Sequence, residues 1–178
     1  MILAAGESKR YGSNKLLSIY KGKPLIEYVL NLVKNSFSNK IIVLGKYKKE
    51  IEENFDLSNF IIVHNKNYSE GLSSSLKEGI KRSITPWTMI FLADMPEIQR
   101  EFVDFLIDRS SNDFLAYYLT YKNQKGFPVL IHERLYNKIA KIYGDKGLRT
   151  VLKDKTLACS IEINDSRCLF DIDKQELE

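Results

Sequence analysis

The sequence is poor in cysteine and has no long apolar run. Its two cysteines, Cys159 and Cys168, cannot build a disulfide framework, and no C-x-x-C pair is present. No apolar stretch approaches the roughly 20 residues that cross a bilayer. The first residues lack the basic segment of a secretion signal and soon reach a glycine. These absences argue against a disulfide-rich scaffold, a cysteine zinc module and a membrane protein, and they predict a cytoplasmic protein with reduced thiols.

An excess of charge of one sign is also lacking. The 178 residues carry 27 Lys and Arg against 23 Asp and Glu, a net charge of +4 with neutral His, without a long block of either sign. This balance argues against a nucleic-acid partner and permits an anionic small-molecule ligand. With 44% hydrophobic and 28% charged residues the composition is globular, and the length predicts a single domain over residues 1–178.

The apolar pattern alternates short continuous runs with helical spacing. Continuous runs, typical of strands buried on both faces, occupy residues 1–5, 41–45, 60–63 and 89–93. Spacings of three and four residues predict helices over 25–33, 72–80, 102–109, 135–142 and 147–152. A hairpin is expected from 114–121 and 128–131, followed at the end by strand and loop. The pattern predicts an α/β fold with a mostly parallel sheet covered on both faces and a small β-hairpin extension.

Ligands of such sheets bind where the parallel strands end. This rule selects three loops, at residues 6–23, 64–75 and 94–97, and all three are rich in Gly, Ser, Asp or basic residues. The first loop combines Gly6, which allows close approach of the backbone to a ligand, with the cations Arg10 and Lys15. It is neither a Walker A loop nor a G-x-G-x-x-G fingerprint. Each basic residue alone fits a solvated surface, but a loop this long in a compact domain favours ligand binding.

The other two loops carry hydroxyl and carboxylate groups. Residues 73–75 are three serines at a helix start, which is more than one helix cap needs, so the surplus hydroxyls could bind a base or phosphate. Asp94 follows an apolar run and could hold Mg²⁺, although taken alone it is better explained by an Asx-turn before Pro96. Asp171 and Asp173 could close the same metal site or form a solvated terminal turn.

Six segments together resemble the MobA-like nucleotidyltransferases, and most closely their molybdenum cofactor cytidylyltransferase branch. They occur in the order of that family and cover nearly the whole chain. The segments are LAAGESKRYG at 3–12 with KLL at 15–17 and GKPLI at 22–26, EGLSSSLKEG at 70–79, LADMP at 92–96, KGFPVL at 125–130, GDKGLR at 144–149, and DID at 171–173. Phe127 stands where the family commonly has His, Tyr11 where it usually has Met, and no proline follows Asp173.

The resemblance implies a single Rossmann-like (glycosyltransferase-A-like) three-layer α/β/α domain. Such a domain would transfer a nucleoside monophosphate from an NTP, here CTP, to the terminal phosphate of molybdopterin and release pyrophosphate. Mg²⁺ is the implied cofactor, and a molybdoenzyme is a further candidate partner. The open alternatives are GTP-dependent guanylyl transfer, transfer to a sugar phosphate, and a non-catalytic nucleotide-binding accessory protein for a molybdoenzyme.

The resemblance also assigns roles to residues of this chain. The implied nucleotide-binding residues are Leu3, Ala4, Ala5, Gly6, Arg10, Lys15, Gly71, Ser75 and Asp94. Among them Arg10, Lys15 and Asp94 would be catalytic, and Asp94 with Asp173 would bind the metal. The implied acceptor side consists of Gly126, Phe127, Pro128, Asp145 and Arg149. Because an attacking phosphate is already ionised, the expected catalysis is alignment and charge neutralisation without a strong general base.

Overall fold

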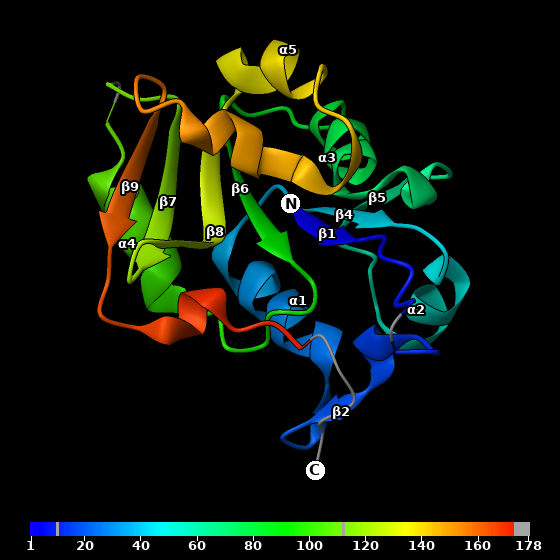
Figure 1. The fold of residues 1–178 in the computed structure, drawn as a ribbon. Helices are drawn as coiled ribbons and strands as arrows, with labels where there is room; N and C mark the ends of the chain where they lie inside the picture. Colours follow the sequence, from blue (N-terminus) through cyan, green and yellow to red (C-terminus); the bar gives the residue numbers. More distant parts are fainter. Residues whose placement is uncertain (10, 112, 173–178) are drawn as a thin grey trace.

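A seven-stranded sheet forms the centre of the molecule (Figure 1). The computed structural model describes residues 1–9, 11–111 and 113–172, and leaves the side chains of residues 145 and 146 undescribed. The sheet has the order β5-β4-β1-β6-β8-β7-β9. The strands are β1 (Ile2–Ala4), β4 (Ile41–Leu44), β5 (Ile61–His64), β6 (Trp87–Leu92), β7 (Ala116–Tyr121), β8 (Gln124–His132) and β9 (Ala158–Glu162).

Strand directions confirm the predicted mostly parallel sheet. β5, β4, β1 and β6 run parallel, β8 is antiparallel to both β6 and β7, and β9 runs parallel to β7. The predicted hairpin is therefore β7–β8, joined at Lys122 and Asn123, whose φ angles of 48° and 63° are those of a tight two-residue turn. For this reason β8 begins at Gln124, four residues before the predicted start.

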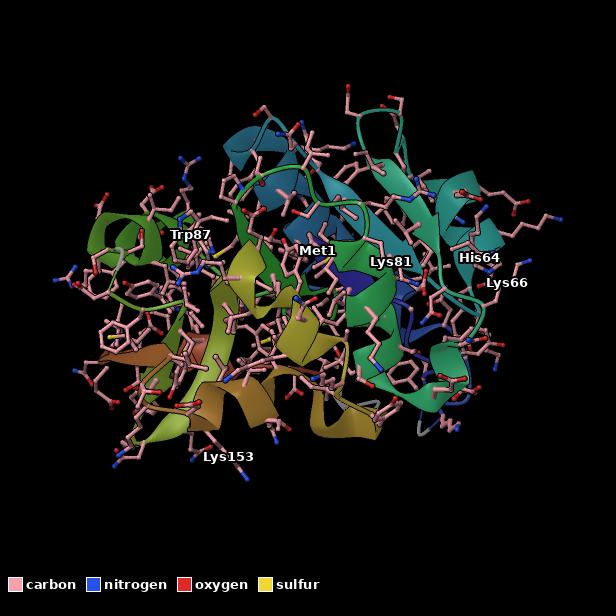
Figure 2. All side chains as sticks on the ribbon, turned by 90° about the horizontal axis from the view of Figure 1, so that it is seen from above. Met1, His64, Lys66, Lys81, Trp87 and Lys153 are labelled. Carbon is pink, nitrogen blue, oxygen red and sulfur yellow. The ribbon has the colours of Figure 1, made fainter. Side chains whose placement is uncertain are left out.

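Helices cover both faces of the sheet, which gives three layers of Rossmann-like type. One face packs against α1 (Leu25–Ser36) and α4 (Arg100–Arg109), with α2 (Lys48–Asn54) beside them. The other face packs against α3 (Leu72–Ile80), α5 (Tyr136–Ile139) and the 3₁₀ segment η4 (Gly144–Lys153), as Figures 1 and 2 show. Alternate residues of β1 enter opposite cores, because side chains alternate across a strand. In the described part of the chain, none of the helices is both long and apolar enough to cross a membrane.

Short elements fill the loops. They are the 3₁₀ turns η1 (Lys15–Leu17), η2 (Tyr68–Glu70), η3 (Glu133–Leu135) and η5 (Ser166–Leu169), and the two-stranded ribbon of β2 (Ile19–Tyr20) and β3 (Lys23–Pro24). The sequence predicted an α-helix at 147–152, but 144–153 forms 3₁₀ turns because Gly147 adopts a left-handed φ of 48°. Both cysteine thiols are free, as expected.

Candidate active site

A cavity of about 420 Å³ opens where β1 and β6 end. Its walls come from the three loops that the sequence selected. The described residues predicted to bind nucleotide all line it, namely Leu3, Ala4, Ala5, Gly6, Lys15, Gly71, Ser75 and Asp94. The structure thus brings these residues together, while their role in binding stays a prediction. Arg10 and Asp173 lie outside the described residues.

Close packing between β1 and β4 shapes the base of this cavity. Gly45 follows β4, and a Cβ atom at this position would lie 2.5 Å from the carbonyl oxygen of Ala5 and 2.9 Å from Cβ of Tyr68. Ala5 and Tyr68 both line the cavity. Only glycine allows the two chain segments to approach this closely, so Gly45 fixes where the first loop starts.

A buried asparagine orients the first loop, and the sequence analysis missed it. The Asn14 side chain accepts a hydrogen bond from the Leu16 backbone N–H at 3.2 Å and donates one to Glu50 of α2 at 3.2 Å. It therefore caps η1 and anchors it to a neighbouring helix. This anchoring places Lys15, the first residue of η1, toward the end of β6.

Three segments far apart in the sequence meet at Lys15. Its Nζ lies 2.7 Å from Oδ2 of Asp94 and donates a hydrogen bond of 2.8 Å to the carbonyl oxygen of Ile172. The Ile172 backbone N–H in turn donates to the Asp94 carbonyl at 3.3 Å. The first loop, the end of β6 and the C-terminal segment therefore converge on one cation. Ile172 directly precedes Asp173 in the sequence.

The serines of the second loop bond to the protein itself, while the predicted binding of a base or phosphate stays a prediction. The N-cap of α3 is Gly71, at φ 94°, without a side-chain cap. Buried Asn65 donates through Nδ2 to the hydroxyls of Ser74 at 2.8 Å and Ser75 at 3.0 Å. The Ser74 hydroxyl donates to backbone carbonyls of the same loop. These hydroxyls thus satisfy a buried amide, and of the three serines only Ser75 lines the cavity.

Three of the predicted acceptor residues, Gly126, Phe127 and Pro128, lie across β6 from β1, whereas η4, which carries Arg149, packs against α3. None of these four residues lines the cavity. Gly126, Phe127 and Pro128 belong to β8, which pairs with β6. A Cβ atom on Gly126 would meet the Cys168 carbonyl at 2.5 Å, so η5 packs directly on this strand. Arg149 is exposed on η4, and the side chain of Asp145 lies outside the described part of the chain.

Lys125 joins the two acceptor segments, and the sequence analysis did not select it. From β8 its Nζ donates to the carbonyl oxygen of Leu152 in η4 at 2.6 Å. Burial lowers the pKa of Lys125, and the neighbouring cations Lys153 and Arg149 lower it further. Exposed Lys153 projects from the edge of the molecule in Figure 2. A concentration of positive charge therefore lies beside the predicted acceptor strand.

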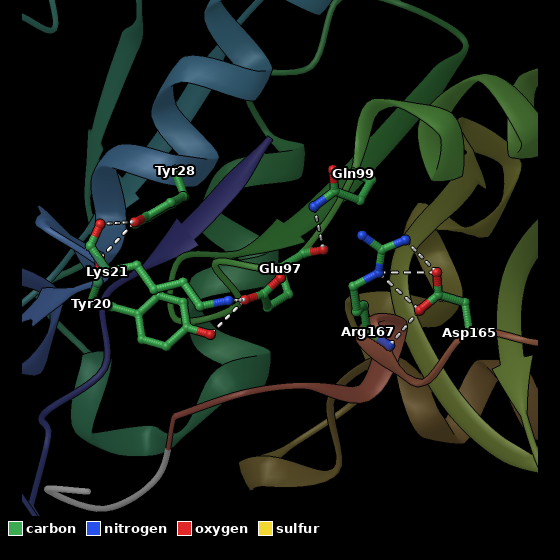
Figure 3. Close-up of polar contacts among 7 residues, drawn as sticks. All are labelled: Tyr20, Lys21, Tyr28, Glu97, Gln99, Asp165 and Arg167. Atoms are coloured by element: carbon green, nitrogen blue, oxygen red, sulfur yellow. Dashed lines mark hydrogen bonds and ion pairs between the residues drawn. The ribbon is translucent and has the colours of Figure 1, made fainter. Parts of the chain in front are cut away.

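The carboxylate of Glu97 links the loop at residues 94–97 to the loop at residues 6–23 (Figure 3). Glu97 accepts hydrogen bonds from the Tyr20 hydroxyl at 2.5 Å and from the Lys21 ammonium at 2.6 Å. Tyr20 and Lys21 belong to the β2–β3 ribbon that follows Lys15. The hydrogen bonds from Lys21 and Tyr20 lower the pKa of Glu97, because they stabilise its ionised form.

Replacing Glu97 with Gln is expected to lower stability at neutral pH, and the loss should shrink in acid. The folded-state pKa of Glu97 lies below its ordinary value of 4.5, so its contribution is fully present above pH 4.5 and is lost as the pH falls through the folded-state pKa. Thermal unfolding of wild type and Glu97→Gln between pH 7 and 3 measures this. Glu101→Gln, at an exposed position of α4, controls for the loss of one acid. A constant difference in melting temperature at all pH values would contradict the assignment.

The fold is that of an open α/β protein, and the cavity lies where ligands of such proteins bind, at the ends of the parallel strands. The MobA-like NTP transferase domain matches residues 1–159. The chain therefore belongs to the MobA-like NTP transferase family, and by family it is a nucleotidyltransferase.

Known proteins with similar sequence or structure agree with this membership. A protein of Bacillus cereus (strain B4264) named probable molybdenum cofactor guanylyltransferase is 27% identical over 143 residues, which cover 78% of this chain and 70% of that protein. The crystal structure of Rv0371c from Mycobacterium tuberculosis H37Rv has a TM-score of 0.85 at 20% identity and covers 97% of this chain and 90% of that one. A complex of Rv0371c with manganese has a TM-score of 0.75 at 18% identity, covering 91% and 85%. At these identities the two solved structures support the fold alone.

Proposed function

We propose that this protein transfers a nucleoside monophosphate from an NTP to the terminal phosphate of molybdopterin and releases pyrophosphate, as a step of molybdenum cofactor biosynthesis. The observation that carries this proposal is the convergence of Lys15 and Asp94 in a cavity built by the three predicted loops. Family membership supplies the reaction type. The name of the Bacillus cereus relative supports molybdopterin as the acceptor.

The first loop is the proposed triphosphate site. Gly6 lines the cavity, and a Cβ atom there would meet nothing within 4 Å, so backbone and ligand can approach each other closely. Lys15, with Arg10, would neutralise the charge that builds up on the α-phosphate and on the leaving pyrophosphate. Gly71 and Ser75 also line the cavity and are proposed to face the nucleoside.

The oxygen atoms around Lys15 fit a divalent cation. The Asp94 carboxylate and the Ile172 carbonyl already share one ammonium group, and both are the hard oxygen ligands that Mg²⁺ prefers. Among residues 1–9, 11–111 and 113–172, no three Asp, Glu, His or Cys side chains cluster to hold a metal by themselves. This arrangement suits a metal held by one or two carboxylates and by substrate phosphates. We assign Asp94 and Asp173 as the ligands of a divalent ion; manganese is the ion in the complex of the fold neighbour Rv0371c. The ion, when bound, would neutralise phosphate charge.

No general base is required in the proposed reaction. The attacking phosphate is ionised at neutral pH, so the protein has to align it with the α-phosphate and offset the charge. Lys125 and Arg149 are proposed to hold the acceptor anion, with Gly126, Phe127 and Pro128 on the strand that carries Lys125. Asp145 stays a predicted acceptor residue. The acceptor would then approach from the β8 side of β6, and the nucleotide from the β1 side.

GTP is the nucleotide that the relatives favour. The sequence resemblance predicted CTP, but the Bacillus cereus relative is named a guanylyltransferase. We therefore propose GTP, with CTP as the second candidate. A non-catalytic accessory protein is a weaker candidate, because Lys15 and Asp94 are both in place.

Pyrophosphate release in the presence of divalent metal tests the function directly. GTP, CTP, ATP and UTP are each supplied with and without molybdopterin. The expected result is pyrophosphate release from GTP that depends on molybdopterin. Release from CTP and from none of the other nucleotides would instead support the cytidylyl transfer predicted from the sequence. Release with a sugar phosphate in place of molybdopterin would change the acceptor. Absence of release with every NTP and acceptor would overturn the proposed function.

A further inference from the structure

We infer that Lys15 occupies the place of the catalytic cation until a nucleotide arrives, so that the divalent metal enters the site together with the NTP. The inference rests on the proposed function, because it assigns Asp94 to the metal. It adds a second role to Lys15, which controls access to Asp94 as well as binding phosphate.

The Lys15 ammonium lies directly beside the Asp94 carboxylate. Its Nζ lies 2.7 Å from Oδ2 of Asp94 and 2.8 Å from the carbonyl oxygen of Ile172. The side chains of Lys15 and Asp94 are only 14% and 23% exposed, so water screens the pair incompletely. A cation bound between these two oxygens is what a metal site at Asp94 would also hold.

The Lys15 ammonium and a divalent metal exclude each other beside Asp94, because both are positively charged. Mg²⁺ binds oxygen ligands at about 2.0–2.1 Å, which would put it next to the ammonium if Lys15 stayed where it is. Two positive charges at such a distance repel strongly in a partly buried site. A metal without nucleotide must therefore displace Lys15 and leave its ammonium without the Asp94 carboxylate.

A bound triphosphate removes the cost of separating the Lys15 ammonium from the Asp94 carboxylate. Lys15 also lines the cavity in which the phosphates are proposed to lie, so its ammonium can exchange the Asp94 carboxylate for phosphate oxygen. The Asp94 carboxylate is then open to the metal that the triphosphate brings. Nucleotide and metal binding are consequently coupled, and each strengthens the other.

Binding of Mn²⁺ without nucleotide, followed by electron paramagnetic resonance, tests the exchange without any turnover. We expect weak binding to wild type and binding at least about tenfold tighter to Lys15→Met, since typical couplings between sites are 5- to 150-fold. Lys15→Arg keeps the cation and should bind as weakly as wild type. Exposed Lys66 supplies a matched charge control, and Lys66→Met should not tighten binding. In the double variant Lys15→Met/Asp94→Asn, the gain in Mn²⁺ affinity should disappear, because the proposed metal ligand is gone.

The same measurement with a non-hydrolysable NTP analogue provides the second arm. The analogue should tighten Mn²⁺ binding to wild type by more than it does to Lys15→Met, where the lysine is already gone. If Lys15→Met does not fold, two measurements still test the inference. They are the effect of the analogue on Mn²⁺ binding to wild type and the Mn²⁺ affinity of the uncharged variant Lys15→Gln. Equal Mn²⁺ affinity of wild type and Lys15→Met or Lys15→Gln without nucleotide would overturn the inference. Failure of every NTP in the pyrophosphate assay would instead overturn the proposed function.

Discussion

Asp94→Asn is expected to lower the turnover number by about 10²- to 10³-fold, which is the typical cost of removing one group that stabilises transition-state charge. The amide keeps the shape of the side chain but loses the charge that is proposed to hold the metal. The dissociation constant for NTP should rise far less than the turnover number falls, because the phosphate contacts of the first loop remain and only the coupling to the metal is lost. Steady-state pyrophosphate release and equilibrium titration with a non-hydrolysable analogue measure the two quantities separately.

A second aspartate makes the comparison specific. Asp104 lies on α4 and pairs with Arg100 at 2.8 Å on the surface, so Asp104→Asn removes the same charge from a helix that does not line the cavity. Its turnover should match that of wild type. If Asp94→Asn turned over as fast as wild type, Asp94 would have no part in the mechanism.

Gly45→Ala is expected to cost about 2–3 kcal/mol of stability, near the upper part of the usual range for overpacking. The added methyl group would lie 2.5 Å from the Ala5 carbonyl and 3.0 Å from its Cα. Both are backbone atoms of the strand end, so relief requires β1 and β4 to separate. Urea denaturation measures the free energy of unfolding.

Gly6→Ala provides the control for this prediction. Gly6 lies at the start of the first loop, and an added Cβ meets nothing within 4 Å, so its stability should change by less than about 0.5 kcal/mol. If Gly45→Ala were as stable as Gly6→Ala, the contact between the two strand ends would be looser than the structure indicates.

The central strands and helices could be predicted from the sequence because each has a recognisable apolar pattern within its own residues. The strands β4 and β6 are continuous apolar runs, and α1 has a regular apolar stripe. α2 was missed because it buries only Ile51 among charged residues. Likewise, η4 was predicted to be helical because its apolar spacing is helical, and the left-handed Gly147 that prevents this has no signature of its own.

The site could be predicted only as far as local motifs and a resemblance reach. Loops at strand ends are visible in the sequence, and so are their glycines, serines and carboxylates. The partners of Asn65 and Glu97 are not, since a buried amide or carboxylate is satisfied by whatever the fold places beside it. The Glu97 contact with Tyr20 spans 77 positions, and no pattern in either segment indicates the other.

The segment from Cys168 to Ile172 connects the strand proposed to bind the acceptor with the proposed metal site. At one end Cys168 packs on Gly126 of β8, and at the other Ile172 bonds to Asp94 and Lys15. Five residues thus span the distance between these two proposed sites. Cys168 is fully buried, and burial raises its thiol pKa to about 11, so the segment is protected from thiol chemistry. We therefore expect a shift of β8 at Gly126 to displace the Lys15–Asp94 pair through this short segment.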